Sequence, residues 1–177
     1  MSHLKPEVSD LDHRAGPENA PVTLVEYGDY ECPYCGSAHP IVERVRKELG
    51  PRLRFVFRHF PLKEIHPHAL MAAQAAEAAA AQGKFWEMHD LLYDHQTALD
   101  ESHLLGYAKK LGLDAARFQK DLEAGVYAQR VRADFRSGVR SGVNGTPTFF
   151  VNGDRLDGSW YYNDLMAAVE RAGAVRK

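Results

Sequence analysis

The most informative stretch of the chain is residues 22–35, which read VTLVEYGDYECPYC. The first six residues are rich in β-branched side chains and lie between turn-forming residues, which predicts a short buried strand over 22–27. The last four contain the only two cysteines of the chain, Cys32 and Cys35, at the start of a pattern typical of a helix. A C-x-x-C pair that follows a strand and opens a helix is typical of a redox-active dithiol.

The spacing of the two cysteines suits a disulfide that forms and opens reversibly. Residues three apart in a helix lie on one face, so the two sulfurs can bond without a large movement of the backbone. The N–H donors and the positive end of the helix dipole favour a thiolate at Cys32. The alternative is half of a structural zinc site, but the sequence has no second C-x-x-C pair and its histidines lack zinc-finger spacing. We therefore expect no metal and no organic cofactor.

Length, charge and hydropathy limit the class of protein. The chain has 177 residues, 45% of them hydrophobic, and a formal net charge of −2, so neither a nucleic acid nor an anionic membrane is an expected partner. No apolar run approaches the roughly 20 residues needed to cross a bilayer. The first residues contain no apolar segment of a signal peptide. This favours a cytoplasmic protein, or a periplasmic or extracytoplasmic one if a signal peptide has been removed.

The remaining pattern predicts an α/β fold. A helix over 33–49 and a strand over 53–58 complete a βαβ unit, and no strand signal follows for about 75 residues. Strand signals return at 148–151, before the hairpin turn Asn152-Gly153, a return strand over 155–158 and a last helix over 161–171. Between the halves we expect helices over 68–82, 85–93, 102–111, 114–123 and 126–141, with Ser102 and Asp114 as N-caps.

The domain organisation follows from the same pattern. Residues 1–15 are polar and predict a flexible lead-in. Residues 16–174 then form a single domain, with a helical insertion over about 66–141.

Four motifs give the chain a family resemblance. They are VEYGDYECPYC at 25–35, RHFPL at 58–62, GKFWEMH at 83–89 and GVNGTPTFFVNG at 142–153. Together with the βαβ…ββα order and the helical insertion, they resemble the DsbA-like thiol-disulfide oxidoreductases of the thioredoxin-fold superfamily, including thioredoxin-like domains fused to some antiporters. The resemblance spans most of residues 15–172.

The resemblance implies roles for particular residues. Cys32 matches the nucleophile, which should be the more exposed thiol with the lowered pKa, and Cys35 matches the buried resolving thiol. Pro147 matches a proline that follows a cis peptide bond, faces the cysteines and leaves the backbone of Thr146 free to pair with a substrate. The residues between the cysteines, Pro33 and Tyr34, match positions that tune the reduction potential and contact substrate.

Glu26 is a carboxylate on an otherwise apolar strand, which is an expensive group to bury. The resemblance implies a buried acid that carries the proton of the resolving cysteine. The alternative is a glutamate at the end of a strand that reaches solvent.

The predicted function is exchange of disulfides with protein substrates, assisted by a redox partner that recycles the dithiol. Because Pro33-Tyr34 contains no basic residue and Asp29 and Glu31 are acidic, we expect a weaker oxidant than DsbA. Two alternatives remain open at this point: a glutathione-dependent transferase or isomerase with the same fold, and a non-enzymatic redox-sensing module.

Overall fold

The computed structural model describes residues 2–174, which form two compact units. The sheet unit contains the residues up to 28, residues 37–58 and the residues from 136 onward, and the helical unit contains 29–36 and 59–135. The helical unit therefore interrupts the sheet unit in sequence, as a helical insertion does. The domain boundaries expected from the sequence, 1–15 and 16–174, stay predictions.

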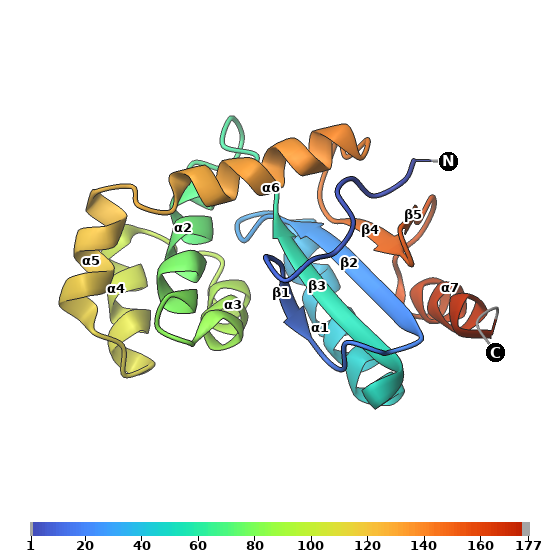
Figure 1. The fold of residues 1–177 in the computed structure, drawn as a ribbon. Helices are drawn as coiled ribbons and strands as arrows, with labels where there is room; N and C mark the ends of the chain where they lie inside the picture. Colours follow the sequence, from blue (N-terminus) through green and yellow to red (C-terminus); the bar gives the residue numbers. More distant parts are fainter. Residues whose placement is uncertain (1, 175–177) are drawn as a thin grey trace. The chain divides into compact units, whose positions relative to one another are not determined.

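The sheet is mixed and has five strands in the order β1-β3-β2-β4-β5 (Figure 1). Three neighbouring pairs, β1 with β3, β2 with β4 and β4 with β5, are antiparallel. Six of the seven residues in each of β2 and β3 are buried, which explains their almost continuous apolar sequence. The strands are β1 His13–Ala15, β2 Val22–Gly28, β3 Leu53–His59, β4 Thr148–Val151 and β5 Asp154–Arg155.

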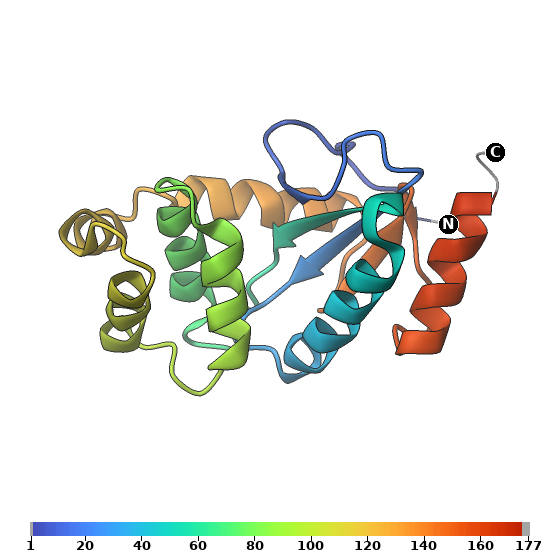
Figure 2. The same cartoon turned by 90° about the horizontal axis from the view of Figure 1, so that it is seen from below.

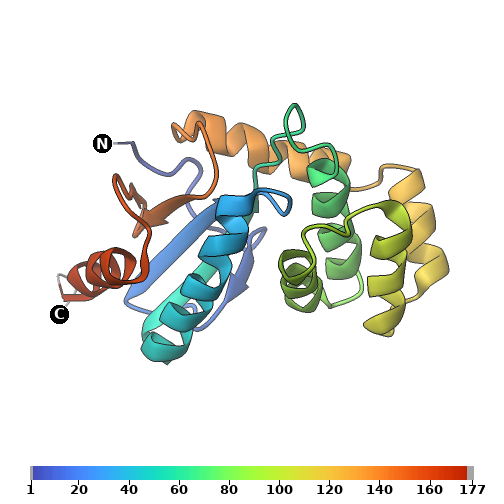
Figure 3. The ribbon, with the colours of Figure 1, turned by 180° about the vertical axis from the view of Figure 1, so that it is seen from behind.

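Two helices lie on the same side of this sheet. They are α1 Pro33–Leu49, whose first turn belongs to the helical unit, and α7 Tyr162–Ala174. Figure 2 shows α1 below β2 and β3 and α7 to the right of the strands, and Figure 3 shows α1 in front of them. A short 3-10 helix, Gly50–Arg52, joins α1 to β3. Together β2, α1 and β3 confirm the predicted order of strand, helix and strand.

The hairpin between β4 and β5 has a shorter return strand than the sequence predicts. The turn itself is as expected, because Asn152 and Gly153 both have positive φ, at 49° and 90°, as a type I′ turn requires. The return strand covers only Asp154–Arg155, instead of 155–158. The paired residues are Val151 with Asp154 and Phe150 with Arg155, and one further hydrogen bond, from Leu156 N to Phe149 O at 2.8 Å, follows them.

The N-terminal segment makes more contacts than the sequence suggested. Residues 13–15 form β1, which the sequence did not predict because three residues are too few to show alternation. Leu4 is buried and its N–H donates to Gly153 O at 2.8 Å. The flexibility of 1–15 stays a prediction, but part of this segment belongs to the packed sheet unit.

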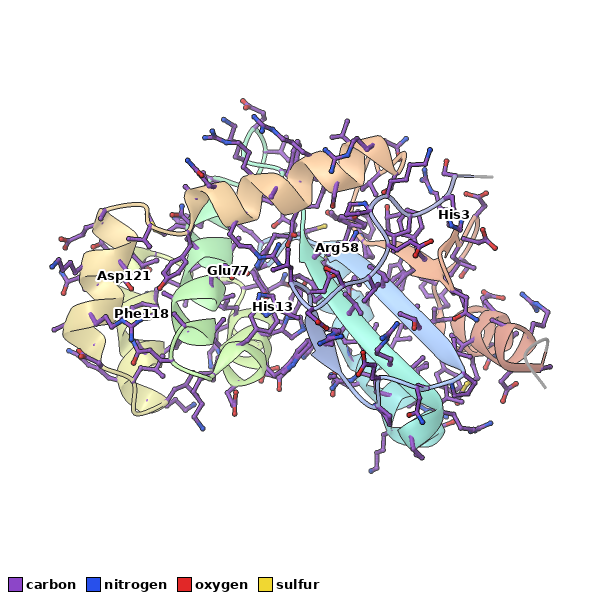
Figure 4. All side chains as sticks on the ribbon, in the orientation of Figure 1. His3, His13, Arg58, Glu77, Phe118 and Asp121 are labelled. Carbon is purple, nitrogen blue, oxygen red and sulfur yellow. The ribbon has the colours of Figure 1, made fainter. Side chains whose placement is uncertain are left out.

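The helical unit is built around α2, which contains eight alanines, seven of them buried, that allow neighbouring helices to approach closely. Helices α3, α4 and α5 all contact α2, and Phe118 on α5 is fully buried among them (Figure 4). The helices are α2 Ala69–Ala80, α3 Phe85–Asp94, α4 Glu101–Lys110, α5 Ala115–Glu123 and α6 Ala128–Arg140, the last of which continues into the sheet unit.

One of the two predicted helix caps is confirmed. The carboxylate of Asp114 accepts a hydrogen bond from Arg117 N at 3.0 Å and caps α5. The prediction for Ser102 is wrong, because α4 begins one residue earlier. Its cap is Asp100, whose extended backbone brings the side chain to His103 N.

No helix within residues 2–174 has the length and apolar character that crossing a bilayer would need.

Candidate redox site

The two cysteines stand where the loop after β2 becomes α1. The carbonyl of Cys32 accepts a hydrogen bond from Gly36 N at 3.0 Å, which makes Cys32 the residue that caps the helix. Both cysteines are in the reduced, thiol form. Cys32 is 3% exposed and Cys35 is 0% exposed, so the order of exposure is as expected although both residues are buried.

A buried aspartate fixes the loop that carries the cysteines. Asp29 is 1% exposed, and its Oδ1 accepts from Glu31 N at 2.8 Å and from Cys32 N at 3.2 Å. Its Oδ2 accepts from Leu62 N and from His66 Nδ1, both at 2.8 Å. Both oxygens of one carboxylate thus connect the backbone before Cys32 to the segment after β3.

A second acidic residue of the same loop is also paired. Glu31 accepts from His68 N at 2.6 Å, and its other oxygen lies 2.8 Å from His68 Nδ1. The sequence argument for a weak oxidant assumed unopposed negative charge at Asp29 and Glu31. Each of these carboxylates in fact contacts an imidazole, Asp29 that of His66 and Glu31 that of His68.

The third support of the loop comes from a glutamine. Gln96 Nε2 donates to Tyr30 O at 2.9 Å and to Cys32 O at 2.8 Å. The ring of Tyr30 is held separately, because its hydroxyl lies 2.9 Å from His89 Nδ1 in the interior of the helical unit. Tyr34, between the cysteines, is by contrast 68% exposed, where a substrate could reach it.

The other predicted site residues belong to the sheet unit. The Thr146–Pro147 peptide bond is cis, which confirms that expectation. Pro147 lines a hollow of about 290 Å³ together with Trp160 and the residues around β5. Glu26 is 2% exposed on β2, opposite Phe149 of β4. Its burial removes the alternative of a strand-end glutamate in solvent, whereas the roles of Glu26, Thr146 and Pro147 stay predictions.

A second group of buried charges lies in the helical unit. His59 Nε2 is 2.7 Å from Glu77 Oε1, and its backbone N–H donates to Asp134 at 3.0 Å. Arg130 donates to the other oxygen of Asp134 at 2.7 Å. Burial raises the pKa of Asp134 above its ordinary value, although His59 and Arg130 oppose the shift. Because each partner has an opposite charge within reach, this group has the character of a structural network.

A family model described as thioredoxin matches residues 9–171. The chain belongs to the thioredoxin family. Two curated relatives of this thioredoxin-family chain are named Na⁺/H⁺ antiporter NhaA. The Salinispora arenicola protein (NhaA 1) is 52% identical over 171 residues, and the Herminiimonas arsenicoxydans protein is 47% identical over 168. These matches cover 97% and 94% of this chain but 26% and 27% of those proteins. The chain thus spans about a quarter of the length of these relatives.

Solved structures agree with the family assignment. A thioredoxin-like oxidoreductase from Silicibacter pomeroyi has a TM-score of 0.81 and 32% identity, and 93% of each chain is covered. Oxidised BdbD from Bacillus subtilis has a TM-score of 0.86 and 23% identity, with 98% of each chain covered. Wolbachia pipientis α-DsbA1 has a TM-score of 0.83 and 16% identity, with 96% of this chain and 94% of that chain covered. The last two show the fold alone, which is that of the DsbA-like proteins of this family.

Sequence reasoning missed the residues that support the thioredoxin-family loop. Asp29 was read only as a charge, although its place three residues before Cys32 is the spacing of a side chain that caps a turn. His66 and Gln96 lie 34 and 64 residues beyond Cys32 in sequence, and no local pattern connects either of them to the loop.

Proposed function

We propose that the chain is a thiol-disulfide oxidoreductase that exchanges disulfides with protein substrates through Cys32 and Cys35. The observation that carries the proposal is the pair of thiols, three residues apart at the N-terminus of α1, in a loop held by Asp29 and Gln96. The printed description of the 32%-identical Silicibacter pomeroyi protein, a thioredoxin-like oxidoreductase, supports the same reaction class.

The proposed reaction has two exchange steps. In the reductive direction the Cys32 thiolate attacks one sulfur of a substrate disulfide, and the other substrate sulfur leaves as a thiolate and takes up a proton. The Cys35 thiol then loses its proton and attacks Cys32 Sγ. This releases the second substrate thiol and leaves a Cys32–Cys35 disulfide. The oxidative direction is the reverse of these steps, starting from that disulfide and a substrate dithiol.

The other predicted residues receive roles in this scheme. Glu26 takes the proton of Cys35, and Thr146 and Pro147 offer backbone to an extended substrate. Pro33 and Tyr34 face the substrate between the cysteines. An apolar groove of about 470 Å³ is lined by Leu62, Ile65 and residues of α6, and it would take apolar side chains of the substrate. The groove is connected to the redox loop through Leu62, whose N–H donates to Asp29.

The working direction depends on the potential of the couple and on the compartment. A redox partner recycles the dithiol. The cytoplasmic location expected from the sequence stays a prediction; in a reducing compartment, reduction or isomerisation would be favoured over net oxidation. We expect a potential nearer the roughly −200 mV of glutaredoxins than the about −120 mV of DsbA.

Catalysed reduction of insulin disulfides by dithiothreitol tests the proposal. The chain should accelerate the reaction, and Cys32→Ser should abolish the acceleration because the attacking sulfur is lost. Cys35→Ser should retain attack and accumulate a mixed disulfide with the substrate, visible on a non-reducing gel. No acceleration by the chain, together with failure to refold a protein with scrambled disulfides, would favour a redox-sensing module. Activity in a glutathione-conjugation assay that survives Cys35→Ser would favour the transferase.

A further inference from the structure

The turn after α3 carries a side chain that reaches the redox loop. Gln96 is two residues beyond the end of α3, and its single Nε2 group donates to Tyr30 O at 2.9 Å and to Cys32 O at 2.8 Å. An amide nitrogen has two N–H groups, so both carbonyls can be satisfied at once. The second carbonyl belongs to the residue that caps α1 and carries the proposed nucleophile.

The turn that presents Gln96 is fixed by its own contacts. Ala98 N donates to His95 O at 2.9 Å, and Tyr107 of α4 donates its hydroxyl to Ala98 O at 2.7 Å. The rings of His95 and Tyr107 lie 5.4 Å apart. The backbone on both sides of Gln96 is therefore fixed by contacts within the turn and with α4.

Helix α1 has a glycine, Gly36, at the position that the side chain of Gln96 approaches. A Cβ placed on Gly36 would lie 2.0 Å from Gln96 Oε1 and 2.6 Å from its Cδ, closer than non-bonded atoms can approach. Gly36 lies inside α1, where alanine would ordinarily be favoured over glycine by up to about 1 kcal/mol. The absence of a side chain there leaves room for the carboxamide, an observation independent of the hydrogen bonds.

We propose that Gln96 is a positioning residue that sets the reactivity of Cys32, and that Gly36 leaves the space Gln96 needs. The inference deepens the proposed oxidoreductase function and rests on it. Gln96 keeps the carbonyl of Cys32 aligned with the first turn of α1, so that the N–H donors of that turn remain available to the Cys32 sulfur. Without the amide, the carbonyls of Tyr30 and Cys32 turn toward water and the thiolate loses part of its stabilisation.

Titration of Cys32 in the full chain tests the proposal directly. Cys35→Ser serves as the background, because Cys32 is then the only thiol. In this background Gln96→Ala should slow alkylation of Cys32 by iodoacetamide at neutral pH by about fivefold and move the titration midpoint to higher pH, as the loss of one or two net hydrogen bonds implies. Gln96→Glu should slow it further, since a carboxylate faces both carbonyl oxygens and the thiolate.

Gln82 provides a matched control in the same unit. Its side chain also makes two hydrogen bonds to backbone, to Asp114 O at 3.2 Å and from Asp114 N at 2.8 Å, but at α5. Gln82→Ala should therefore remove similar contacts and leave the titration of Cys32 unchanged. An unshifted midpoint in Gln96→Ala, or an equal shift in Gln82→Ala, would overturn the proposal.

A double-mutant cycle tests the match between Gln96 and Gly36. Gly36→Ala alone should slow alkylation, because the new methyl group displaces the carboxamide. In the Gln96→Ala background the same substitution should have no further effect on the rate, since the obstructing atoms are gone. Additive effects would contradict the match. Alkylation needs no disulfide substrate, so a chain that fails the insulin assay can still pass this test, and the two proposals can fail separately.

Discussion

Arg58 in the sheet unit and Asp29 in the helical unit are buried ions of opposite charge, and both are stabilised by hydrogen bonds to the surrounding chain. Arg58 is 2% exposed (labelled in Figure 4), and all five of its N–H groups donate. The acceptors are both oxygens of Asp12, at 2.7 and 3.0 Å, Tyr27 OH at 2.9 Å, and the carbonyls of Pro6 and Glu7 at 3.0 and 3.2 Å. Asp29 accepts four hydrogen bonds with its two oxygens. Each buried ion has its polar atoms satisfied, which is the condition for burying it.

The two ions differ in what they hold. Burial alone would lower the pKa of Arg58, but the hydrogen bonds to Asp12 and Tyr27 raise it above the ordinary value, so the guanidinium stays charged. It fastens residues 6–12 to the sheet and touches no reactive group. Asp29 fastens the backbone of Cys32. A buried, fully hydrogen-bonded ion therefore stabilises a packed segment in the sheet unit and orients the proposed nucleophile in the helical unit.

Loss of Arg58 should have the largest effect on stability. Arg58→Leu removes the cation that faces the buried carboxylate of Asp12, and we expect a loss of about 3–5 kcal/mol in the free energy of unfolding. Urea denaturation measures this loss. Arg54→Leu is the matched control on the same strand, because Arg54 makes one part-buried hydrogen bond, to Thr23. The alkylation rate of Cys32 in the folded fraction should not change; a slower rate would contradict the separation of roles.

Loss of the charge at Asp29 should have a smaller effect on stability and a distinct effect on reactivity. Asp29→Asn exchanges one acceptor oxygen for an NH₂ donor. If the NH₂ group replaces Oδ2 it faces Leu62 N and His66 Nδ1, and if it replaces Oδ1 it faces Glu31 N and Cys32 N. We expect the free energy of unfolding to fall by about 1–3 kcal/mol. We also expect the alkylation of Cys32 to slow, because the displaced backbone of Cys32 should outweigh the benefit to the thiolate of removing a negative charge. Asp94→Asn, at an exposed position in the same unit, is the control. A destabilised variant with normal Cys32 reactivity would reduce Asp29 to the purely structural role of Arg58.

The smallest effect is expected at Asp100, an exposed ion of the helical unit. Its hydrogen bond to His103 lowers its pKa. A carboxyl group with a lowered pKa in the folded state adds stability above its unfolded pKa of about 3.9, and that contribution is lost as the pH falls through the folded value. Asp100→Asn keeps a good N-cap and removes the charge. The urea midpoint of the unchanged chain should therefore exceed that of Asp100→Asn at pH 6, and this excess should become smaller by pH 3. A constant difference would contradict the assigned pKa shift.

Residues 22–35 and the pattern after them were sufficient to predict the order of the main elements and the C-x-x-C pair. These features are local: β2 is a continuous apolar run, α1 is periodic, and Asn152-Gly153 forms its turn from its own φ preferences. The three-residue strand β1 was missed because it owes its place to pairing with β3.

The candidate site was predictable only in part, for the same reason. Cys32, Cys35 and the cis bond before Pro147 followed from motifs. The supports of the redox loop, Gln96 and His66, act across long stretches of sequence. Their contacts arise from packing within the helical unit, which no local pattern in one sequence encodes.

Equilibration of the chain in glutathione buffers of graded potential tests the central claim most directly. Mass spectrometry after acid quenching and thiol blocking reports whether Cys32 and Cys35 form a disulfide. We expect one reversible transition between dithiol and disulfide, near the roughly −200 mV of glutaredoxins. A midpoint at the about −120 mV of DsbA would contradict the expected weaker oxidant. Two thiols that remain reduced in every buffer, or that form only separate adducts with glutathione, would contradict the redox couple itself.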